Sequence, residues 1–285
     1  MYIIKDVENL RKKIKYFKII NKKIGLVPTM GNLHNGHIQL ILLSKKYADI
    51  VIVSIFINPM QFNNLLDLKN YPRTFERDYT ILKNNNVDIL FFPDIHEMYP
   101  NGIKNQTFVQ VPKLSDIVEG QSRPGHFKGV TTIITKLFNI IQPDFSFFGE
   151  KDYQQLLIIQ TLVKELNYAI KIISLPIVRS KNGLALSSRN NNLNSQEIKI
   201  APYLYEIIER TSEKIIQEGN INIIENVINE SKILLLKKGF SIDIFNIYKY
   251  KTLDIPDKKT QKMIILASVW LGNTRLIDNK KIFFS

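Results

Sequence analysis

The chain has 285 residues, a net charge of +13 and no cysteine, and 45% of its residues are hydrophobic while 23% are charged. This length suits one large or two modest domains, and the composition is that of an ordinary globular protein in water. The lack of cysteine excludes disulfides, thiolate metal sites and cysteine nucleophiles.

The N-terminal segment argues against a secretory or membrane protein. Residues 1–18 alternate charged and apolar side chains, without the continuous apolar stretch of a signal peptide. The longest apolar run, about residues 50–57, is far shorter than the roughly 20 residues that cross a bilayer. We therefore expect a cytoplasmic protein that makes no membrane contact.

The positive charge does not by itself indicate a nucleic-acid partner. The lysines are scattered in pairs such as Lys12–Lys13 and Lys237–Lys238, and they do not form one basic block interleaved with aromatic residues. The chain is also rich in Ile, Asn, Lys, Phe and Tyr, whose codons are A/T-rich. A biased genomic base composition explains the high isoelectric point, and we expect no nucleic-acid ligand.

Apolar runs alternate with helical patterns through the first 175 residues. Pro28 is expected to end the first strand. Strands are predicted at 25–27, 50–57, 87–92, 145–148 and 170–175, and helices at 36–48, 74–84, 130–141 and 153–166. This alternation favours an α/β fold, a Rossmann-like parallel sheet with helices on both faces, and residues 93–129 are expected to form loops at its edge.

The pattern changes after about Pro176. The elements predicted beyond it are two long amphipathic helices, at 195–217 and 221–238, and strands of a small antiparallel sheet, at 241–248 and 263–271. We expect a domain at 1–176 and a smaller α+β domain at 177–285, which face each other across a cleft.

Four polar clusters follow strand ends, which is where ligands bind in open α/β sheets. In the first, His34 and His37 stand where a strand passes into a helix N-terminus, whose N–H groups and positive partial charge attract phosphate. Taken alone, the turn could equally carry two exposed histidines without a ligand.

The second cluster contains Asn58 and Gln61, which follow the most apolar strand. Their amides can hold hydroxyls and carboxylates without adding charge, although a polar loop at a strand end often contains such residues without a ligand.

The third cluster is the segment Gly-Glu-Lys-Asp-Tyr-Gln-Gln at 149–155. Lys151 would face the positive end of a helix dipole there, a conflict that a bound anion would resolve. Asp152 can cap the same helix, and Gln155 lies one turn further along it.

The fourth cluster is Ser187-Ser188-Arg189-Asn190, preceded by Arg179 and Gly183. Hydroxyls and a guanidinium on a loop are typical of a clamp for nucleotide phosphates, although such a loop also simply precedes helices. Arg123, in a Ser-Arg-Pro-Gly-His turn, and Arg73 add two further cations, and Arg73 is equally consistent with a surface role.

Several other kinds of site are excluded. No Gly-x-Gly-x-x-Gly follows the first strand, and the chain has no Walker-type loop, no Gly-x-Ser-x-Gly elbow and no zinc-protease spacing among its four histidines.

In these clusters the chain resembles the pantothenate synthetase family, the pantoate–β-alanine ligases of the HxGH nucleotidyltransferase superfamily. The resemblance covers essentially the whole chain. The matching segments, in the family's order and spacing, are PTMGNLHNGH (28–37), SIFINPMQF (54–62), YPRT (71–74), SRPGHFKGV (122–130), FGEKDYQQL (148–156), GLALSSRN (183–190) and LIDN (276–279). Two small departures are Asn182, where the family commonly has an acid, and Asn191-Asn192, where an aromatic residue often follows.

The resemblance implies a two-step reaction. The carboxylate of pantoate attacks the α-phosphate of ATP to give pantoyl adenylate and pyrophosphate, and the amine of β-alanine then displaces AMP to form pantothenate. The resemblance also implies Mg²⁺ with ATP and a homodimer, but it identifies no protein ligand of the metal.

The resemblance also implies roles for particular residues. Catalysis is assigned to His34, His37 and Lys151. The other residues of the implied ATP site are Met30, Gly149, Glu150, Asp152, Val178, Leu186, Ser187, Ser188 and Arg189. Those implied to hold pantoate and β-alanine are Gln61, Gln155, Asn58 and Arg123. The second domain would act as a lid that protects the adenylate from water.

Two alternatives remain open from the residues. One is another adenylyl or cytidylyl transferase with the same turn, although the neutral Gln61 and Gln155 favour a small hydroxy acid over a phosphorylated substrate. The other is an inactive, basic RNA-binding protein, which predicts salt-sensitive RNA affinity and no turnover.

Overall fold

The computed structural model describes residues 1–284, and the chain divides into two compact units. The first comprises Met1–Glu150 and Gln154–Pro176. The second comprises Lys151–Tyr153 together with the chain from Ile177 onward. Among the described residues, no helix is both long enough and apolar enough to cross a bilayer.

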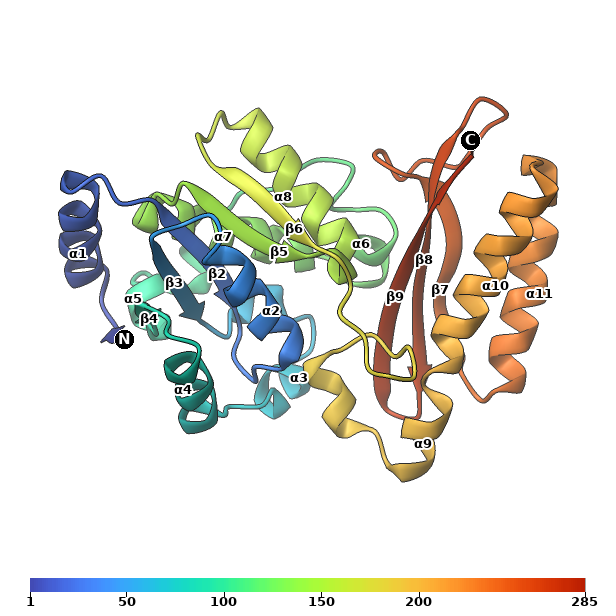
Figure 1. Cartoon of the computed structure of the whole chain (residues 1–285), viewed down its shortest axis with the longest axis horizontal. Helices are drawn as coiled ribbons and strands as arrows, with labels where there is room; N and C mark the ends of the chain where they lie inside the picture. The colour runs from blue at the N-terminus through green and yellow to red at the C-terminus, as the bar shows by residue number, and fades with distance from the viewer. Residues whose placement is uncertain (285) are drawn as a thin grey trace. The chain divides into compact units, whose positions relative to one another are not determined.

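A six-stranded parallel sheet forms the centre of the first unit, in the order β1-β4-β3-β2-β5-β6 (Figure 1). Its strands are β1 (Tyr2–Ile4), β2 (Ile24–Thr29), β3 (Ile50–Ile55), β4 (Ile89–Phe91), β5 (Phe145–Gly149) and β6 (Lys171–Leu175). The helices of this unit are α1 (Val7–Ile19), α2 (Asn35–Ser44), α3 (Leu65–Asn70), α4 (Phe75–Asn84), α5 (Ile95–Met98), α6 (Glu119–Ser122), α7 (His126–Ile141) and α8 (Tyr153–Glu165). Its short 3-10 turns are η1 (Pro59–Gln61) and η2 (Ile103–Asn105), while η3 (Glu150–Asp152), which lies before α8, is divided between the two units.

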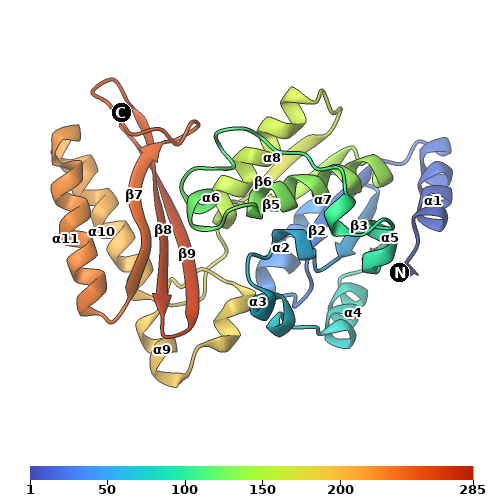
Figure 2. The ribbon, with the colours of Figure 1, turned by 180° about the vertical axis from the view of Figure 1, so that it is seen from behind.

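Helices cover both faces of this sheet because successive side chains of each strand point to opposite faces. Ile52 of β3 belongs to an apolar cluster with Leu10 of α1 and with much of α7 and α8. Its neighbour Val53 belongs to a second cluster, with Ile41 of α2 and Leu82 of α4. The opposite views in Figures 1 and 2 show helices on each side of the sheet. The predicted Rossmann-like fold is confirmed.

One prediction about the first strand is wrong. Pro28 does not end it, because β2 continues to Thr29, where it pairs with Ile55 of β3. On its other side β2 pairs with β5 only at residues 25–26. Pro28 therefore lies where one side of β2 is unpaired, and its missing N–H need not break a ladder bond.

Other differences in the first unit concern its first strand and several helices. Neither β1 nor α1 was predicted, because charged residues dominate that segment, although Leu10, Ile14 and Phe17 form a buried stripe on α1. The segment 93–129, predicted as loops, contains α5, η2, α6 and the start of α7.

The second unit combines an antiparallel sheet with helices. Its strands are β7 (Ser241–Lys249), β8 (Lys262–Leu271) and β9 (Thr274–Phe283), in the order β7-β8-β9. Its helices are α9 (Ser195–Ile200), α10 (Tyr203–Glu218) and α11 (Ile224–Lys237), with 3-10 turns η4 (Ser188–Asn192) and η5 (Ile221–Ile223). Apolar residues of α10 and α11 share one core with alternate residues of the strands. The small antiparallel sheet is confirmed.

The helix predicted at 195–217 is instead two helices. The chain breaks at Ala201-Pro202, and Pro202 directly precedes the first residue of α10. Proline has no N–H to donate, so it is tolerated at a helix start and not in a helix interior. The strand β9 was not predicted, because the polar run from Asp278 to Lys281 interrupts its apolar alternation.

Candidate active site

The turn after β2 places His34 and His37 at the start of α2, as predicted. His34 is the N-cap residue, and its Nδ1 accepts a hydrogen bond from the N–H of Gly36 at 3.1 Å. The Nδ1 of His37 accepts one from the N–H of His34 at 3.2 Å, and the two ring centroids lie 4.1 Å apart.

These two bonds fix which nitrogen of each ring carries a hydrogen. A ring nitrogen that accepts a hydrogen bond is unprotonated, so each neutral imidazole carries its hydrogen on Nε2. Both histidines are thereby set up as Nε2–H donors at a helix N-terminus. The partial positive charge of that helix end favours an anion at the same place.

Asp78 of α4 shapes the loop that leads to these histidines. Its two carboxylate oxygens accept from the N–H groups of Asn32 and Leu33, each at 2.8 Å, and one of them also accepts from the hydroxyl of Thr74 at 3.0 Å. Asp78 is buried, and Gly31 has a φ of +78°, which favours glycine. Sequence reasoning missed Asp78, because nothing along the chain links it to residues 45 positions earlier.

The second predicted cluster follows β3, the strand beside β2 in the sheet. The side-chain nitrogen of Gln61 lies 3.0 Å from the sulfur of Met30, a residue predicted for the ATP site. The oxygen of the Gln61 amide accepts from the amide nitrogen of Asn58 at 3.2 Å. The structure therefore brings Met30, Asn58 and Gln61 together within the first unit.

The amide of Asn58 is directed entirely at protein atoms. Its nitrogen also donates to the carbonyl of Gly129 at 3.0 Å, and its oxygen accepts from the hydroxyl of Tyr99 at 2.7 Å and the N–H of Met60 at 3.3 Å. Asn58 is only 1% exposed. These surroundings make Asn58 a support for Gln61, and its predicted contact with substrate stays a prediction.

Arg123 connects to Gln61 through a histidine that was not predicted as a site residue. The Nδ1 of His126 lies 2.7 Å from the main-chain oxygen of Gln61, and its Nε2 lies 3.1 Å from a guanidinium nitrogen of Arg123. A carbonyl oxygen only accepts, so Nδ1 donates and Nε2 accepts from Arg123. The Arg-Pro-Gly-His turn is thus tied to the cluster after β3. By contrast, Arg73 donates to the carbonyls of Leu68, Lys69 and Tyr71, which close the end of α3.

The remaining predicted residues of the first unit lie at the end of β5 and the start of α8. Gly149 is the last residue of β5, and a Cβ added there would meet no atom within 4 Å. Glu150 accepts from the hydroxyl of Ser174 in β6 at 3.0 Å. Gln155 is half-buried in the first turn of α8. Its contact with substrate stays a prediction.

In the second unit, Lys151 is held by the motif near the C-terminus. The amide nitrogen of Asn279 donates to the main-chain oxygen of Lys151 at 3.0 Å. The Lys151 side chain is 17% exposed, and its amine lies 3.9 Å from the carboxylate of Asp152. The residue before Asn279, Asp278, is buried and receives both terminal nitrogens of Arg179, at 2.6 and 2.8 Å.

The fourth cluster is built on a short hairpin. The N–H of Leu186 donates to the carbonyl of Val178 at 2.9 Å, so these two predicted ATP-site residues lie side by side. Ser187 caps η4 by accepting from the N–H of Arg189 at 3.3 Å, and Ser188 is the first residue of that turn. Ser187 and Lys151 also line the same small internal cavity, of about 10 Å³.

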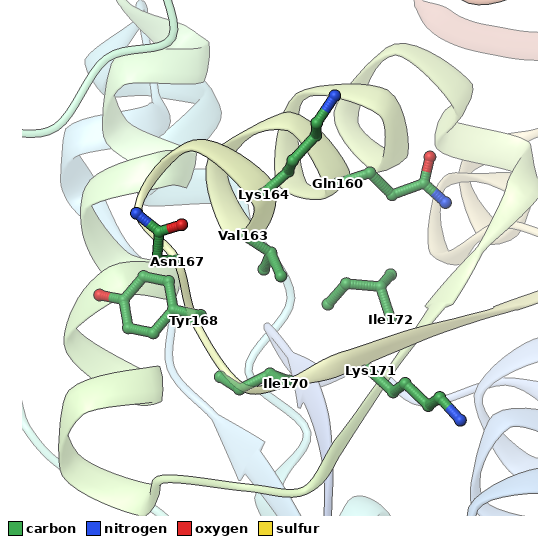
Figure 3. Close-up of a pocket in the computed structure, with 8 residues that line it drawn as sticks. All are labelled: Gln160, Val163, Lys164, Asn167, Tyr168, Ile170, Lys171 and Ile172. Carbon is green, nitrogen blue, oxygen red and sulfur yellow. The ribbon is translucent and has the colours of Figure 1, made fainter.

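A larger surface hollow lies elsewhere. It has a volume of about 500 Å³ and is bordered by α8 and the beginning of β6 (Figure 3). Figure 3 shows Val163 and Ile172 beside it, while the amines of Lys164 and Lys171 point away. It lies at the N-terminal end of β6, opposite to the strand ends that carry the clusters, and its polar groups do not converge. We do not assign it to the site.

A parallel α/β sheet with paired imidazoles at a helix N-terminus defines a class, the α/β proteins that bind nucleotide phosphates. The family model described as pantoate-beta-alanine ligase matches residues 2–281. The chain belongs to this family.

Relatives with the name pantothenate synthetase match this chain along nearly their whole length. A pantothenate synthetase from Buchnera aphidicola subsp. Acyrthosiphon pisum (strain 5A) is 73% identical over 285 residues, which is 100% of both chains. Another, from Buchnera aphidicola subsp. Schizaphis graminum (strain Sg), is 65% identical over 282 residues and covers 99% of both chains.

Solved structures of proteins with the same family name are also similar to this chain. The pantothenate synthetase of Thermus thermophilus has a TM-score of 0.91 at 36% identity and covers 99% of this chain and 100% of its own. The pantoate-beta-alanine ligase of Francisella tularensis, complexed with beta-gamma ATP and beta-alanine, has a TM-score of 0.81 at 38% identity. That match covers 98% of this chain and 97% of the other.

Proposed function

We propose that this chain condenses pantoate with β-alanine to give pantothenate, at the expense of ATP, which becomes AMP and pyrophosphate. The observation that carries this proposal is the match to the pantoate-beta-alanine ligase family over residues 2–281. It is supported by the Francisella tularensis relative, whose complex holds two molecules of the expected kinds, beta-gamma ATP and beta-alanine.

In the first step, a carboxylate oxygen of pantoate bonds to the α-phosphorus of ATP, and the bond to the leaving pyrophosphate breaks. Both reactants are anions, so cations and N–H donors must offset their repulsion as they approach. We assign this role to the Nε2–H groups of His34 and His37 and to the ammonium of Lys151. His34 and His37 are held as donors by their capping bonds before any ligand arrives.

In the second step, the amine of β-alanine attacks the acyl carbon of the adenylate. AMP leaves with the oxygen that bridged the acyl carbon and phosphorus, and the nitrogen loses a proton. We assign the binding of pantoate and β-alanine to Gln61, Gln155 and Arg123. Asn58 takes part in the proposal as the residue that holds the Gln61 amide.

Further residues are proposed to contact the nucleotide. Ser187, Ser188 and Arg189 would hold the β- and γ-phosphates through hydroxyls and a guanidinium. Gly149 leaves open space for close approach of the nucleotide. The remaining residues proposed to line the nucleotide are Met30, Glu150, Asp152, Val178 and Leu186. We also propose that the part of the chain from residue 177 serves as a lid during the reaction.

ATP is proposed to enter with Mg²⁺, which neutralises charge on the leaving pyrophosphate when bound. Among the described residues, no three His, Asp or Glu side chains gather as a metal centre. Phosphate oxygens and water are therefore the main ligands in this proposal, with the half-exposed carboxylate of Asp152 beside Lys151 as one protein donor that fits. A homodimer and a cytoplasmic location remain predictions.

The proposal is tested by the formation of AMP from ATP in the presence of Mg²⁺, pantoate and β-alanine. We expect AMP and pantothenate in equal amounts, with no AMP when pantoate is omitted. AMP formation that does not depend on pantoate, or ADP as the nucleotide product, would contradict it.

A further inference from the structure

A line of buried hydrogen bonds leads from Tyr99 to Gln61. The hydroxyl of Tyr99 donates to the Asn58 amide oxygen at 2.7 Å, and the Asn58 nitrogen donates to the Gln61 amide oxygen at 3.2 Å. The three residues are 1%, 1% and 8% exposed, respectively. Tyr99 lies directly after α5, so it reaches the cluster from a different part of the chain.

The direction of each bond in this line is determined. An amide oxygen cannot donate, so the Tyr99 hydroxyl must be the donor to Asn58. Burial raises the pKa of Tyr99 above its ordinary value, so the hydroxyl keeps its proton. With its oxygen facing Tyr99, Asn58 turns its nitrogen towards Gln61 and towards the carbonyl of Gly129.

The consequence for Gln61 is a fixed amide orientation. Its oxygen accepts from Asn58, so its nitrogen faces the other way, 3.0 Å from the sulfur of Met30. A thioether is a weak acceptor, and an oxygen of a ligand would be a much better one. Gln61 therefore presents N–H donors, and the group it recognises is an acceptor such as a carboxylate or hydroxyl oxygen.

The position of Tyr99 is itself well defined by its surroundings. Its ring packs near Phe56, with centroids 6.0 Å apart, and the amine of Lys136 in α7 lies 5.2 Å from the ring centroid. Without the hydroxyl, the Asn58 oxygen would keep only the longer bond from the N–H of Met60, at 3.3 Å. The bonds from its nitrogen to Gly129 and Gln61 would remain, so the Asn58 amide would be held less firmly and the orientation of Gln61 would be less strictly fixed.

We propose that Tyr99 is a positioning residue that acts through Asn58 to hold Gln61 as a hydrogen-bond donor to the hydroxy-acid substrate. This inference rests on the proposed function, in which Gln61 binds pantoate. It assigns Tyr99 no contact with substrate.

The test is Tyr99→Phe, which removes one hydroxyl and leaves the ring in place. We expect kcat/KM for pantoate to fall about tenfold, as the loss of one buried hydrogen bond would produce. The KM for ATP should stay within about twofold, because the line of bonds leads to Gln61 and not to the histidines. A circular dichroism spectrum and melting curve of the variant verify that it is folded.

The matched control is Tyr168→Phe. The Tyr168 hydroxyl also donates to an asparagine amide oxygen, that of Asn139 at 3.1 Å, but this bond is exposed, and Tyr168 lines the hollow at the N-terminal end of β6, away from the strand ends that carry the clusters. We expect wild-type kinetics from this control. An equal loss in both variants would overturn the proposal.

A double variant separates positioning from a general structural role. If Tyr99 acts only through Asn58, then Tyr99→Phe should cause little further loss in kcat/KM for pantoate when added to Asn58→Ala. Full additivity of the two losses would overturn the inference, as would wild-type pantoate kinetics in Tyr99→Phe. Neither result would contradict the proposed function. That function is contradicted only if the wild-type protein itself forms no AMP from pantoate and ATP.

Discussion

The amide nitrogen of Asn279 donates to the main-chain oxygen of Lys151 at 3.0 Å, a bond between residues 128 positions apart. Asn279 is buried at 5% exposure, next to Asp278, whose carboxylate holds Arg179. One short motif on β9 thus holds both the lysine proposed to act at the α-phosphate and the start of the hairpin that carries Val178 and Leu186. The resemblance placed this motif in the family pattern without giving it a role.

We expect Asn279→Asp to slow adenylate formation about tenfold, because a carboxylate cannot donate to the Lys151 carbonyl and repels it. Lys151→Ala should be far more damaging, by a factor of about 100 or more, since it removes the charge itself. Single-turnover release of pyrophosphate measures both. A loss in Asn279→Asp as large as that in Lys151→Ala would contradict a supporting role for Asn279.

Substitutions at His37 can distinguish the structural role of its Nδ1 from the proposed catalytic role of its Nε2. Asparagine can place an amide near the Nδ1 position and keep the bond from the His34 N–H, whereas glutamine can place an N–H donor near the Nε2 position. We expect His37→Asn to fold normally and to lose about 100-fold or more in adenylate formation, and His37→Gln to retain more activity.

Stopped-flow release of pyrophosphate gives the rates of these variants, and melting curves give their stability. His96→Asn, at an exposed histidine of α5, is the control and should behave as wild type. Higher activity in His37→Asn than in His37→Gln would show that Nε2 is not the donor that matters.

Because the orientation of Gln61 is fixed, Gln61→Glu adds a negative charge and also removes the N–H donor that faces the substrate. One carboxylate oxygen can still accept from Asn58, but the other replaces the N–H donor with an anion that repels the carboxylate of pantoate. We expect kcat/KM for pantoate to fall about 100-fold or more, with little change in the KM for ATP. Gln160→Glu, at an exposed position of α8, adds the same charge and should have no effect. Equal losses in kcat/KM for pantoate and for ATP would show that Gln61 does not act specifically on pantoate.

Gly149 offers a test of the nucleotide site that does not disturb the fold. It has no φ in the left-handed region, and an added Cβ would meet no protein atom within 4 Å. Gly149→Ala should therefore keep the stability of the protein within about 0.5 kcal/mol in urea unfolding. Its KM for ATP should rise several-fold if nucleotide occupies that space. An unchanged KM for ATP would remove Gly149 from the proposed site.

The sheet and the order of the polar clusters could be predicted because they depend on local periodicity. Val51 to Val53 are apolar without interruption, which is what a strand covered on both faces requires. The strand β9 could not be predicted in this way, since Lys280 and Lys281 interrupt its alternation, and the pairing with β8 decides its structure.

The parts of the candidate site that escaped prediction are those that depend on contacts distant in the sequence. Asp78, Tyr99 and His126 are a buried acid, tyrosine and histidine that any globular protein could contain. Only the folded chain shows that they hold the loop of Asn32, the amide of Asn58 and the backbone of Gln61, respectively.

The most direct measurement of the proposed reaction uses pantoate labelled with ¹⁸O in its carboxylate. If that carboxylate attacks the α-phosphorus and β-alanine then displaces AMP, one labelled oxygen passes from pantoate to AMP. Mass spectrometry of the products should find AMP carrying one ¹⁸O and pyrophosphate carrying none. Unlabelled AMP, or label in inorganic phosphate with ADP as the nucleotide product, would contradict an acyl adenylate in this protein.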